Sequence, residues 1–259
     1  MPKTAFDPGL HGFAFKNEWS LDQAERRQLR RVFRSTLTWG PLLGAIMLGP
    51  AGALLLPLGV CALRRKLETE LARGYGLCGG MSYAALDFFQ AGLPIPRGEG
   101  VHAQPAPGTR LRSYIWQRQL QSLACDLPRF LVWLIVLNDV PSTWLFRGGS
   151  AWLLDRSKGE WKRLRAAVDA GQPVPIGLVR QTRNVFENHQ VLAIGYDRED
   201  EVCGTIYVYD PNCPDDVSAI RVMLGERTLL GQESCSSARS LRGFFCESYR
   251  FSDPARALG

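Results

Sequence analysis

The segment that organises the chain runs from Gly76 to Phe89 and reads GLCGGMSYAALDFF. Its apolar side chains recur at helical spacing and Gly92 follows as a stop signal, so the pattern predicts a helix that begins at Cys78. The amino end of a helix carries partial positive charge, which favours a thiolate over a thiol. Gly79 and Gly80 lack a Cβ, so another segment or a substrate can approach the backbone closely. Cys78 is therefore a candidate nucleophile, and a small buried core cysteine is the structural alternative.

Composition is that of a globular protein with a sizeable core. The chain has 259 residues, of which 46% are hydrophobic and 22% charged, and its net charge is +6. Part of the positive charge is concentrated in one short segment, at Arg26, Arg27, Arg30, Arg31 and Arg34. No RNA- or DNA-binding motif accompanies these arginines. They predict a solvated helix face or charge flanking a membrane segment, and a nucleic-acid partner is not expected.

The cysteines predict a protein of a reducing compartment. There are seven, an odd number, and no C-x-x-C pair or repeated spacing occurs among them. This pattern argues against a disulfide framework and against a structural zinc site, so no metal and no cofactor is expected. Residues 1–12 lack the charged-then-apolar order of a secretion signal. The predicted location is therefore cytoplasmic, with membrane association as an open alternative.

That alternative arises from an uncharged segment, 36–63, which is rich in Leu, Gly, Ala and Pro. Its length passes the threshold for a membrane-spanning helix, but Pro41, Pro50 and Pro57 are expected to break it into shorter pieces. It is interpreted as an apolar helical hairpin that lies on a membrane surface, packs on the main domain or binds a partner. The chain is accordingly divided into an N-terminal segment, 1–70, and a main domain, 71–259.

The main domain changes its periodicity halfway. Helical spacing and helix stop signals predict helices at 109–127, 130–137 and 160–170. Short apolar or alternating runs bounded by turn residues predict strands at 174–179, 190–196, 205–209 and 243–251. Helices followed by strands indicate an α+β domain with an antiparallel sheet.

Two polar residues occur at the ends of these predicted strands. His189 precedes the strand that starts at Gln190, and Asp210 ends the next one. If the two strands form a hairpin, both side chains lie near the same region of the sheet. A carboxylate beside the imidazole fixes its tautomer and leaves the other ring nitrogen to accept the proton of a thiol. Cys78, His189 and Asp210 are thus candidates for a catalytic triad.

These motifs, taken together, resemble those of the papain-like cysteine peptidase superfamily, particularly its bacterial C39-like branch. The resemblance rests on CGG opening a helix at Cys78, on GQPVPI at 171–176, on NHQVLAIGY at 188–196 and on YDPN at 209–212. It covers roughly residues 74–251. It implies a helical layer that carries the nucleophile and packs on an antiparallel sheet, with the N-terminal apolar helical segment as an insertion. It also implies Cys78 as nucleophile, His189 as base and acid, and Asp210 as the orienting residue, with Asn212 as the alternative.

One departure from the family concerns the oxyanion hole. Papain-like enzymes carry a glutamine shortly before the cysteine, and none occupies that neighbourhood here. The Cys78 backbone amide is one candidate donor, and Asn17, Tyr75 and Gln190 are candidates for a second.

Three functions remain open from the sequence. The favoured one is a thiol-dependent hydrolase, a cysteine peptidase or amidase that cleaves a peptide or acyl-amide substrate through a thioester. A transglutaminase-like enzyme or an acyltransferase would use the same thioester with an amine acceptor. A non-enzymatic peptide- or partner-binding protein is the third, and the missing glutamine favours it.

Overall fold

The computed structural model describes residues 1–48, 76–96, 104–139, 148–182, 184–200, 202–214, 216–225, 229–235 and 240–258. The strands are β1 (Val174–Arg180), β2 (His189–Arg198), β3 (Cys203–Tyr209), β4 (Val217–Leu224), β5 (Leu229–Glu233) and β6 (Leu241–Cys246). The helices are α1 (Pro8–His11), α2 (Gln23–Leu48), α4 (Cys78–Gln90), α5 (Arg110–Asp139) and α6 (Gly149–Asp169). Two short 3-10 helices are η1 (Val185–Glu187) and η2 (Pro254–Ala257).

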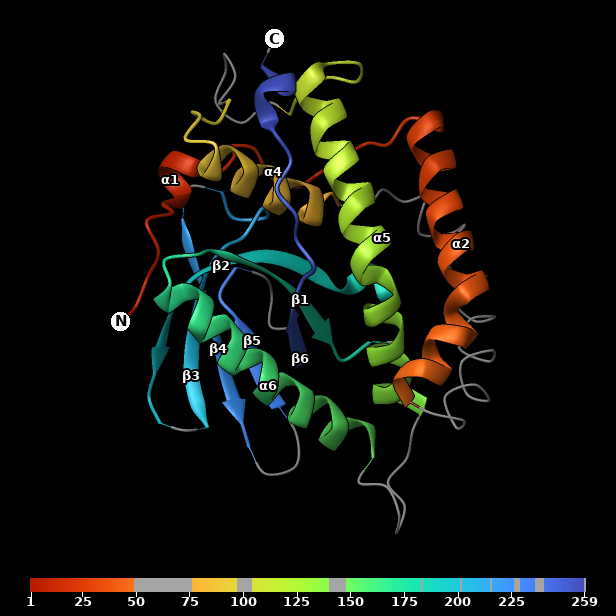
Figure 1. Ribbon diagram of the computed structural model, residues 1–259, viewed down its shortest axis with the longest axis vertical. Coiled ribbons are helices and arrows are strands. Elements are labelled where there is room, and N and C mark those ends of the chain that lie inside the picture. The colour runs from red at the N-terminus through yellow and green to blue at the C-terminus, as the bar shows by residue number, and fades with distance from the viewer. Residues whose placement is uncertain are drawn as a thin grey trace.

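The strands close into an antiparallel barrel (Figure 1). Each strand pairs with the next along the chain, and β1 also pairs with β6, with Ile176 opposite Cys246. The expected papain-like fold, a helical layer on an antiparallel sheet, is therefore wrong. Two strands that the sequence interpretation missed, β4 and β5, prolong the series of hairpins, so the last strand returns to the first.

The positions of four individual strands were predicted more accurately than their assembly into a fold. The predicted runs 174–179, 190–196 and 205–209 lie inside β1, β2 and β3. The fourth, 243–251, overlaps β6, which begins and ends earlier. The barrel wall is apolar on both faces: Leu178 of β1 belongs to a buried cluster with α6, and its neighbour Val179 belongs to a cluster with α4 and α5. Figure 1 shows the corresponding arrangement, with α6 crossing the strands and α4 and α5 on another side.

Helix α4 begins at Cys78, as predicted, and the chain turns at Gly92 with φ 63° after the helix ends. The helix lies very close to its neighbours. A Cβ on Gly80 would overlap the backbone carbonyl oxygen of Ile115 in α5, and a Cβ on Gly79 would overlap the side chain of Gln190. The two glycines after the cysteine are therefore needed for packing of α4 between α5 and β2.

Helix α5 is one continuous element, whereas two helices were predicted because Pro128 lies between them. Proline costs the helix one hydrogen bond, and burial of the flanking Leu127 and Phe130 offsets this loss. By length and composition, α5 is apolar enough to cross a membrane. In the most apolar window of the helix, 61% is buried inside the protein, and a buried core helix passes the same test of length and composition.

Helix α2 differs from its prediction at both ends. The sequence predicts a basic helix that starts with a capping box of Ser20 and Gln23 and ends near residue 33. In the structure Asp22 and Glu25 exchange the two capping hydrogen bonds, at 2.8 and 2.9 Å, and the helix continues through Pro41. The rest of the predicted hairpin, 49–63, and the boundary at residue 70 lie outside the described residues.

The N-terminal residues are packed against the same core as the rest of the chain. Phe13 and Phe33 are buried with residues of α4 and α5. Lys3 forms a β-bridge with Gly195, and the Thr4 amide donates to the Ile194 carbonyl at 2.8 Å. Residues at the start of the chain are thus attached to the middle of β2.

Candidate active site

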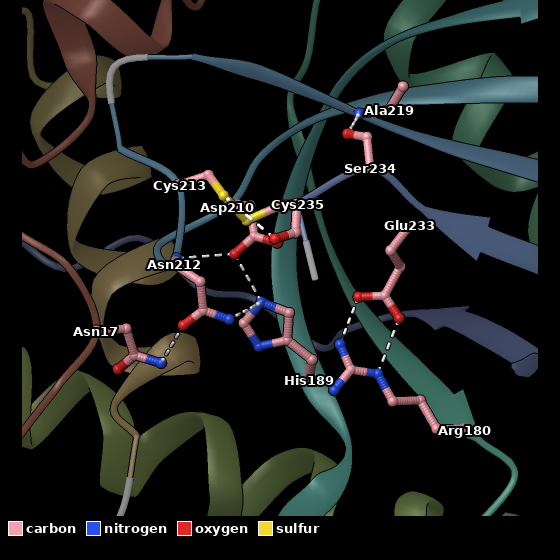
Figure 2. Close-up of a disulfide and its surroundings, with 10 residues drawn as sticks. All are labelled: Asn17, Arg180, His189, Asp210, Asn212, Cys213, Ala219, Glu233, Ser234 and Cys235. Carbon is pink, nitrogen blue, oxygen red and sulfur yellow. Dashed lines mark hydrogen bonds and ion pairs between the residues drawn. A yellow bond between two sulfur atoms is a disulfide. The ribbon is translucent and has the colours of Figure 1, made fainter. Parts of the chain in front are cut away.

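The structure brings together the three residues of the predicted triad. Cys78 is the first residue of α4, His189 is the first residue of β2, and Asp210 follows β3 directly. Pairing of β2 with β3 places Asp210 beside His189, and Asp210 Oδ1 lies 2.7 Å from His189 Nε2 (Figure 2). Cys78 and His189 line the same pocket, and the thiol lies near enough to the imidazole to contribute to the raised pKa of His189. Sulfur, imidazole and carboxylate are therefore gathered at one place.

The two ring nitrogens of His189 have different partners. Nε2 faces Asp210, and Figure 2 shows the second ring nitrogen, Nδ1, turned away from that carboxylate. Because Nε2 is engaged with Asp210, Nδ1 is the nitrogen left for the Cys78 thiol. The ring is held at the strand end by the turn before it, where Asn188 Oδ1 accepts from the Arg180 amide at 2.9 Å. His189 itself is only 4% exposed.

The electrostatics of the pair favour a charged imidazole. Burial lowers the pKa of His189, but the Asp210 carboxylate, its hydrogen bond and Cys78 together raise that pKa from 6.5 to about 10. Burial likewise opposes ionisation of Asp210, but the charge of His189 and its hydrogen bond hold the pKa of Asp210 below its ordinary 3.8. An imidazolium that persists at neutral pH stabilises a thiolate beside it.

A second chain of hydrogen bonds connects the start of α4 with the acid turn. The Leu77 amide donates to Asn17 Oδ1 at 2.6 Å, and Asn17 Nδ2 donates to Asn212 Oδ1 at 3.2 Å. Asn212 Nδ2 lies 3.1 Å from His189 Nε2, and the Asn212 amide donates to Asp210 Oδ1. The Asn17 amide also donates to the Pro211 carbonyl at 3.0 Å. Asn17, which precedes the cysteine by 61 residues, therefore lies beside both Cys78 and the acid turn.

The other two candidate oxyanion donors are placed differently. Gln190 lies next to the start of α4, but its Nε2 donates to Glu247 Oε1 at 2.6 Å and its Oε1 faces Gly79. Burial, followed by the charge of Asp126, raises the pKa of Glu247 well above its usual 4.5. Tyr75 lies outside the described residues. Of the two described candidates, Asn17 is the one whose amide nitrogen lies within the site, where it donates one of its two hydrogens to Asn212.

The site opens into a pocket of about 360 Å³. The polar residues that line it are Asn17, Cys78, Arg180, Glu187, Asn188, His189, Gln190 and Asn212. The apolar residues that line the pocket are Phe33, Leu123, Leu127, Phe130, Val185 and Phe186. Sequence reasoning missed the apolar part, because these six residues come from three distant segments and each reads locally as a core position. Their helical and turn patterns contain no signal that they meet at the cysteine.

A disulfide joins the acid turn to the end of β5. Cys213 and Cys235 are bonded, with a Cα–Cα distance of 6.0 Å, and the Cys213 amide donates to the Asp210 carbonyl at 2.9 Å (Figure 2). The sequence-based argument against disulfides is wrong for this pair. Cysteine spacing along the chain did not show that the loops after β3 and β5 meet. The prediction of a reducing compartment also relied on the expected absence of disulfides, and the Cys213–Cys235 disulfide does not support it.

Among the described residues, no group of three or more His, Cys, Asp or Glu side chains is arranged to hold a metal ion. Comparisons of the chain with protein-family models, with curated proteins and with solved structures find no match. A functional assignment therefore rests on the geometry of the site itself.

Proposed function

We propose that the protein is a thiol-dependent hydrolase that cleaves an amide or related acyl bond through a thioester on Cys78. The observation that supports this most is the placement of Cys78 and His189 in the lining of one pocket, with Asp210 Oδ1 2.7 Å from His189 Nε2. A nucleophile, a base in hydrogen-bond contact and a third group that orients the base are the requirements of acyl transfer. The proposal does not depend on the papain-like fold, which the barrel excludes.

In the proposed reaction the Cys78 thiolate attacks the substrate carbonyl carbon and forms a carbon–sulfur bond. The His189 imidazolium then gives its proton to the leaving nitrogen as the carbon–nitrogen bond breaks. Water attacks the resulting thioester, neutral His189 takes its proton, and the carboxylic acid departs as the carbon–sulfur bond breaks. Asp210 remains ionised throughout and holds the ring in place.

The developing oxyanion needs donors close to Cys78. The backbone amide of Cys78, at the first turn of α4, is one candidate. Asn17 is the other: the Leu77 amide occupies its Oδ1, and its Nδ2 donates one hydrogen to Asn212 Oδ1 and carries a second. Asn17 in this role takes the place of the glutamine that is missing before the cysteine.

A mass-spectrometric trap tests the proposed reaction. Full-length protein is mixed with activated acyl esters, quenched in acid and digested, and we expect an acyl adduct on Cys78 that is absent in Cys78→Ala and strongly reduced in His189→Ala. Cys125 serves as the internal control. This residue is accessible at the surface, and partial desolvation of its thiol is the main cause of its raised pKa. Equal, slow labelling of Cys78 and Cys125 would reject the proposal and favour a binding protein.

The same experiment separates hydrolysis from transfer. An adduct that decays in water at the rate of turnover indicates a hydrolase. An adduct that persists until an amine is added indicates an acyltransferase with the same nucleophile.

A further inference from the structure

The pocket beside Cys78 is lined by two chemically different sets of residues. Polar residues, Cys78 and His189 among them, form one set, and six apolar side chains from α2, α5 and η1 form the other. Four of the six are at most 5% exposed: Phe33, Leu123, Leu127 and Phe130. Phe33 of α2 stacks on Phe186 of η1, with ring centroids 5.1 Å apart, and so completes the apolar wall.

The charged residues that line the pocket already have partners. The Arg180 guanidinium forms a buried ion pair with Glu233 and also donates to the Glu187 carbonyl at 2.9 Å. The Glu187 carboxylate accepts from Thr182 Oγ1 at 2.9 Å. A charged substrate group would have to compete with these contacts and lose its own hydration. The apolar residues of the lining therefore remain to bind a substrate group, and they favour one that is uncharged and apolar.

The position of the pocket relative to the triad indicates which part of a substrate it holds. His189 must face the leaving group, because it delivers the proton there. Ser122 of α5 lies against Gly79, the residue after the thiol, and the α5 residues Leu123, Leu127 and Phe130 line the same pocket as Cys78. The acyl group stays bonded to the sulfur during the reaction, so it is the part of the substrate within reach of these side chains.

We infer that the pocket binds an apolar acyl group, so that the substrate is an acyl donor with a medium-length hydrocarbon chain or an apolar side chain next to its carbonyl. This inference rests on the proposed function. The pocket volume is about 360 Å³. Because a water-sized group occupies roughly 30 Å³, the pocket holds about twelve such groups, which is enough for a hydrocarbon chain of about ten carbons. Burial of each methylene favours binding by roughly fourfold.

A series of 4-nitrophenyl esters tests the inference. The ester transfers its acyl group to Cys78 and releases 4-nitrophenolate, and the leaving group is constant while the linear acyl chain grows from two to twelve carbons. We expect kcat/KM for acylation to rise by roughly fourfold per methylene and to level off at about ten carbons. A second arm compares N-acetyl-Phe and N-acetyl-Asp esters. If the Phe ester exceeds the best linear ester, the acyl group comes from a peptide, and the reverse order points to a fatty acyl donor.

Leu123→Trp fills the apolar part of the pocket and is expected to reduce acylation by long chains far more than acylation by the acetyl ester. Leu120→Trp, a half-buried position one turn earlier on α5 and outside this pocket, is the matched control and should keep the wild-type chain-length profile. Acylation rates that do not depend on acyl length would overturn this inference but not the proposed function. A chain-length profile of Leu123→Trp equal to that of wild type would do the same. Acylation by no ester, with Cys78 still reactive to iodoacetamide, would overturn the proposed function and this inference with it.

Discussion

At the scale of single residues, Asn17 offers the sharpest test of the site. Replacement of Asn17 by Ala removes an amide donor beside Cys78, and loss of one oxyanion donor costs about 100- to 1000-fold in turnover. Alkylation of Cys78 by iodoacetamide builds no oxyanion and should change much less. The two rates, measured on the same preparation, separate stabilisation of the oxyanion from activation of the thiol.

Gln104→Ala is the control for this measurement. Gln104 Nε2 donates to the Lys16 carbonyl at 2.7 Å, so the variant disturbs the same loop without touching the triad. Equal losses of turnover and of alkylation in Asn17→Ala would show that Asn17 only holds the loop in place.

The charge on His189 predicts a pH dependence of stability. The folded-state pKa of about 10 lies above the ordinary 6.5, so the stabilisation is complete below about pH 6.5 and is lost as the pH rises through about 10. For Asp210, whose pKa is lowered, the stabilisation is present above its ordinary 3.8 and is lost as the pH falls. Urea unfolding of wild type and His189→Gln between pH 6 and 10 should give a difference that shrinks with pH. A difference that stays constant or grows would contradict the charged imidazole.

The three triad residues were predictable because each stands at the end of a regular element. A cysteine before two glycines, a histidine at a strand start and an aspartate at a strand end are local patterns. Asn17 was only one of several candidates, since its contact with Leu77 spans 60 residues of sequence. No local pattern reports such a contact.

At the scale of elements, two glycines in helices are expected to respond in opposite ways to replacement by alanine, because one is tightly packed and the other has open space around it. A methyl group on Gly80 would overlap the backbone of α5, so Gly80→Ala should destabilise the protein by about 1 to 3 kcal/mol. Gly159, inside α6, has open space around its Cβ position, and Gly159→Ala should stabilise by about 0.5 to 1 kcal/mol through helix propensity. Chemical denaturation measures both, and a stabilising Gly80→Ala would disprove the close contact.

The strands show why elements were easier to predict than their assembly. β1, β2 and β3 are apolar runs with clear turn signals, so they were recognised. β4 alternates between exposed and buried residues, with Ser218 and Arg221 among its apolar side chains, and it was missed with β5. Without these strands the closure of β6 on β1 could not be anticipated, and the fold prediction failed for that reason.

At the scale of the whole molecule, Asp87 connects three parts of the chain. Its carboxylate accepts from Tyr114 of α5 at 2.8 Å, from Tyr249 at 2.7 Å and from the Ser252 amide at 3.0 Å. Arg118 of α5 forms an ion pair with it at 2.7 Å. Helix α4, helix α5 and the segment after β6 therefore meet at one buried charge.

Asp87→Ala would leave Arg118 buried without its counter-charge, and we expect a loss of about 3 to 5 kcal/mol in the free energy of unfolding. Urea titration followed by tryptophan fluorescence measures it. Glu199→Ala, which removes a half-exposed partner of Arg221, is the control and should cost at most about 1 kcal/mol. A loss for Asp87→Ala no larger than that of the control would show that the buried cluster does not hold the helices together.

The attachment of Lys3 and Thr4 to β2 has a consequence for biosynthesis. A ribosome releases the chain in order, so these first residues emerge while the strand that receives them, near Gly195, has not yet been made. Aromatic side chains such as Phe6 and Phe13 are buried in the folded protein. Until β2 has been synthesised, they are exposed to solvent without the residues that later cover them. Much of the tertiary structure therefore forms late, and during translation the nascent amino-terminal segment is a natural client for chaperones that shield apolar chains.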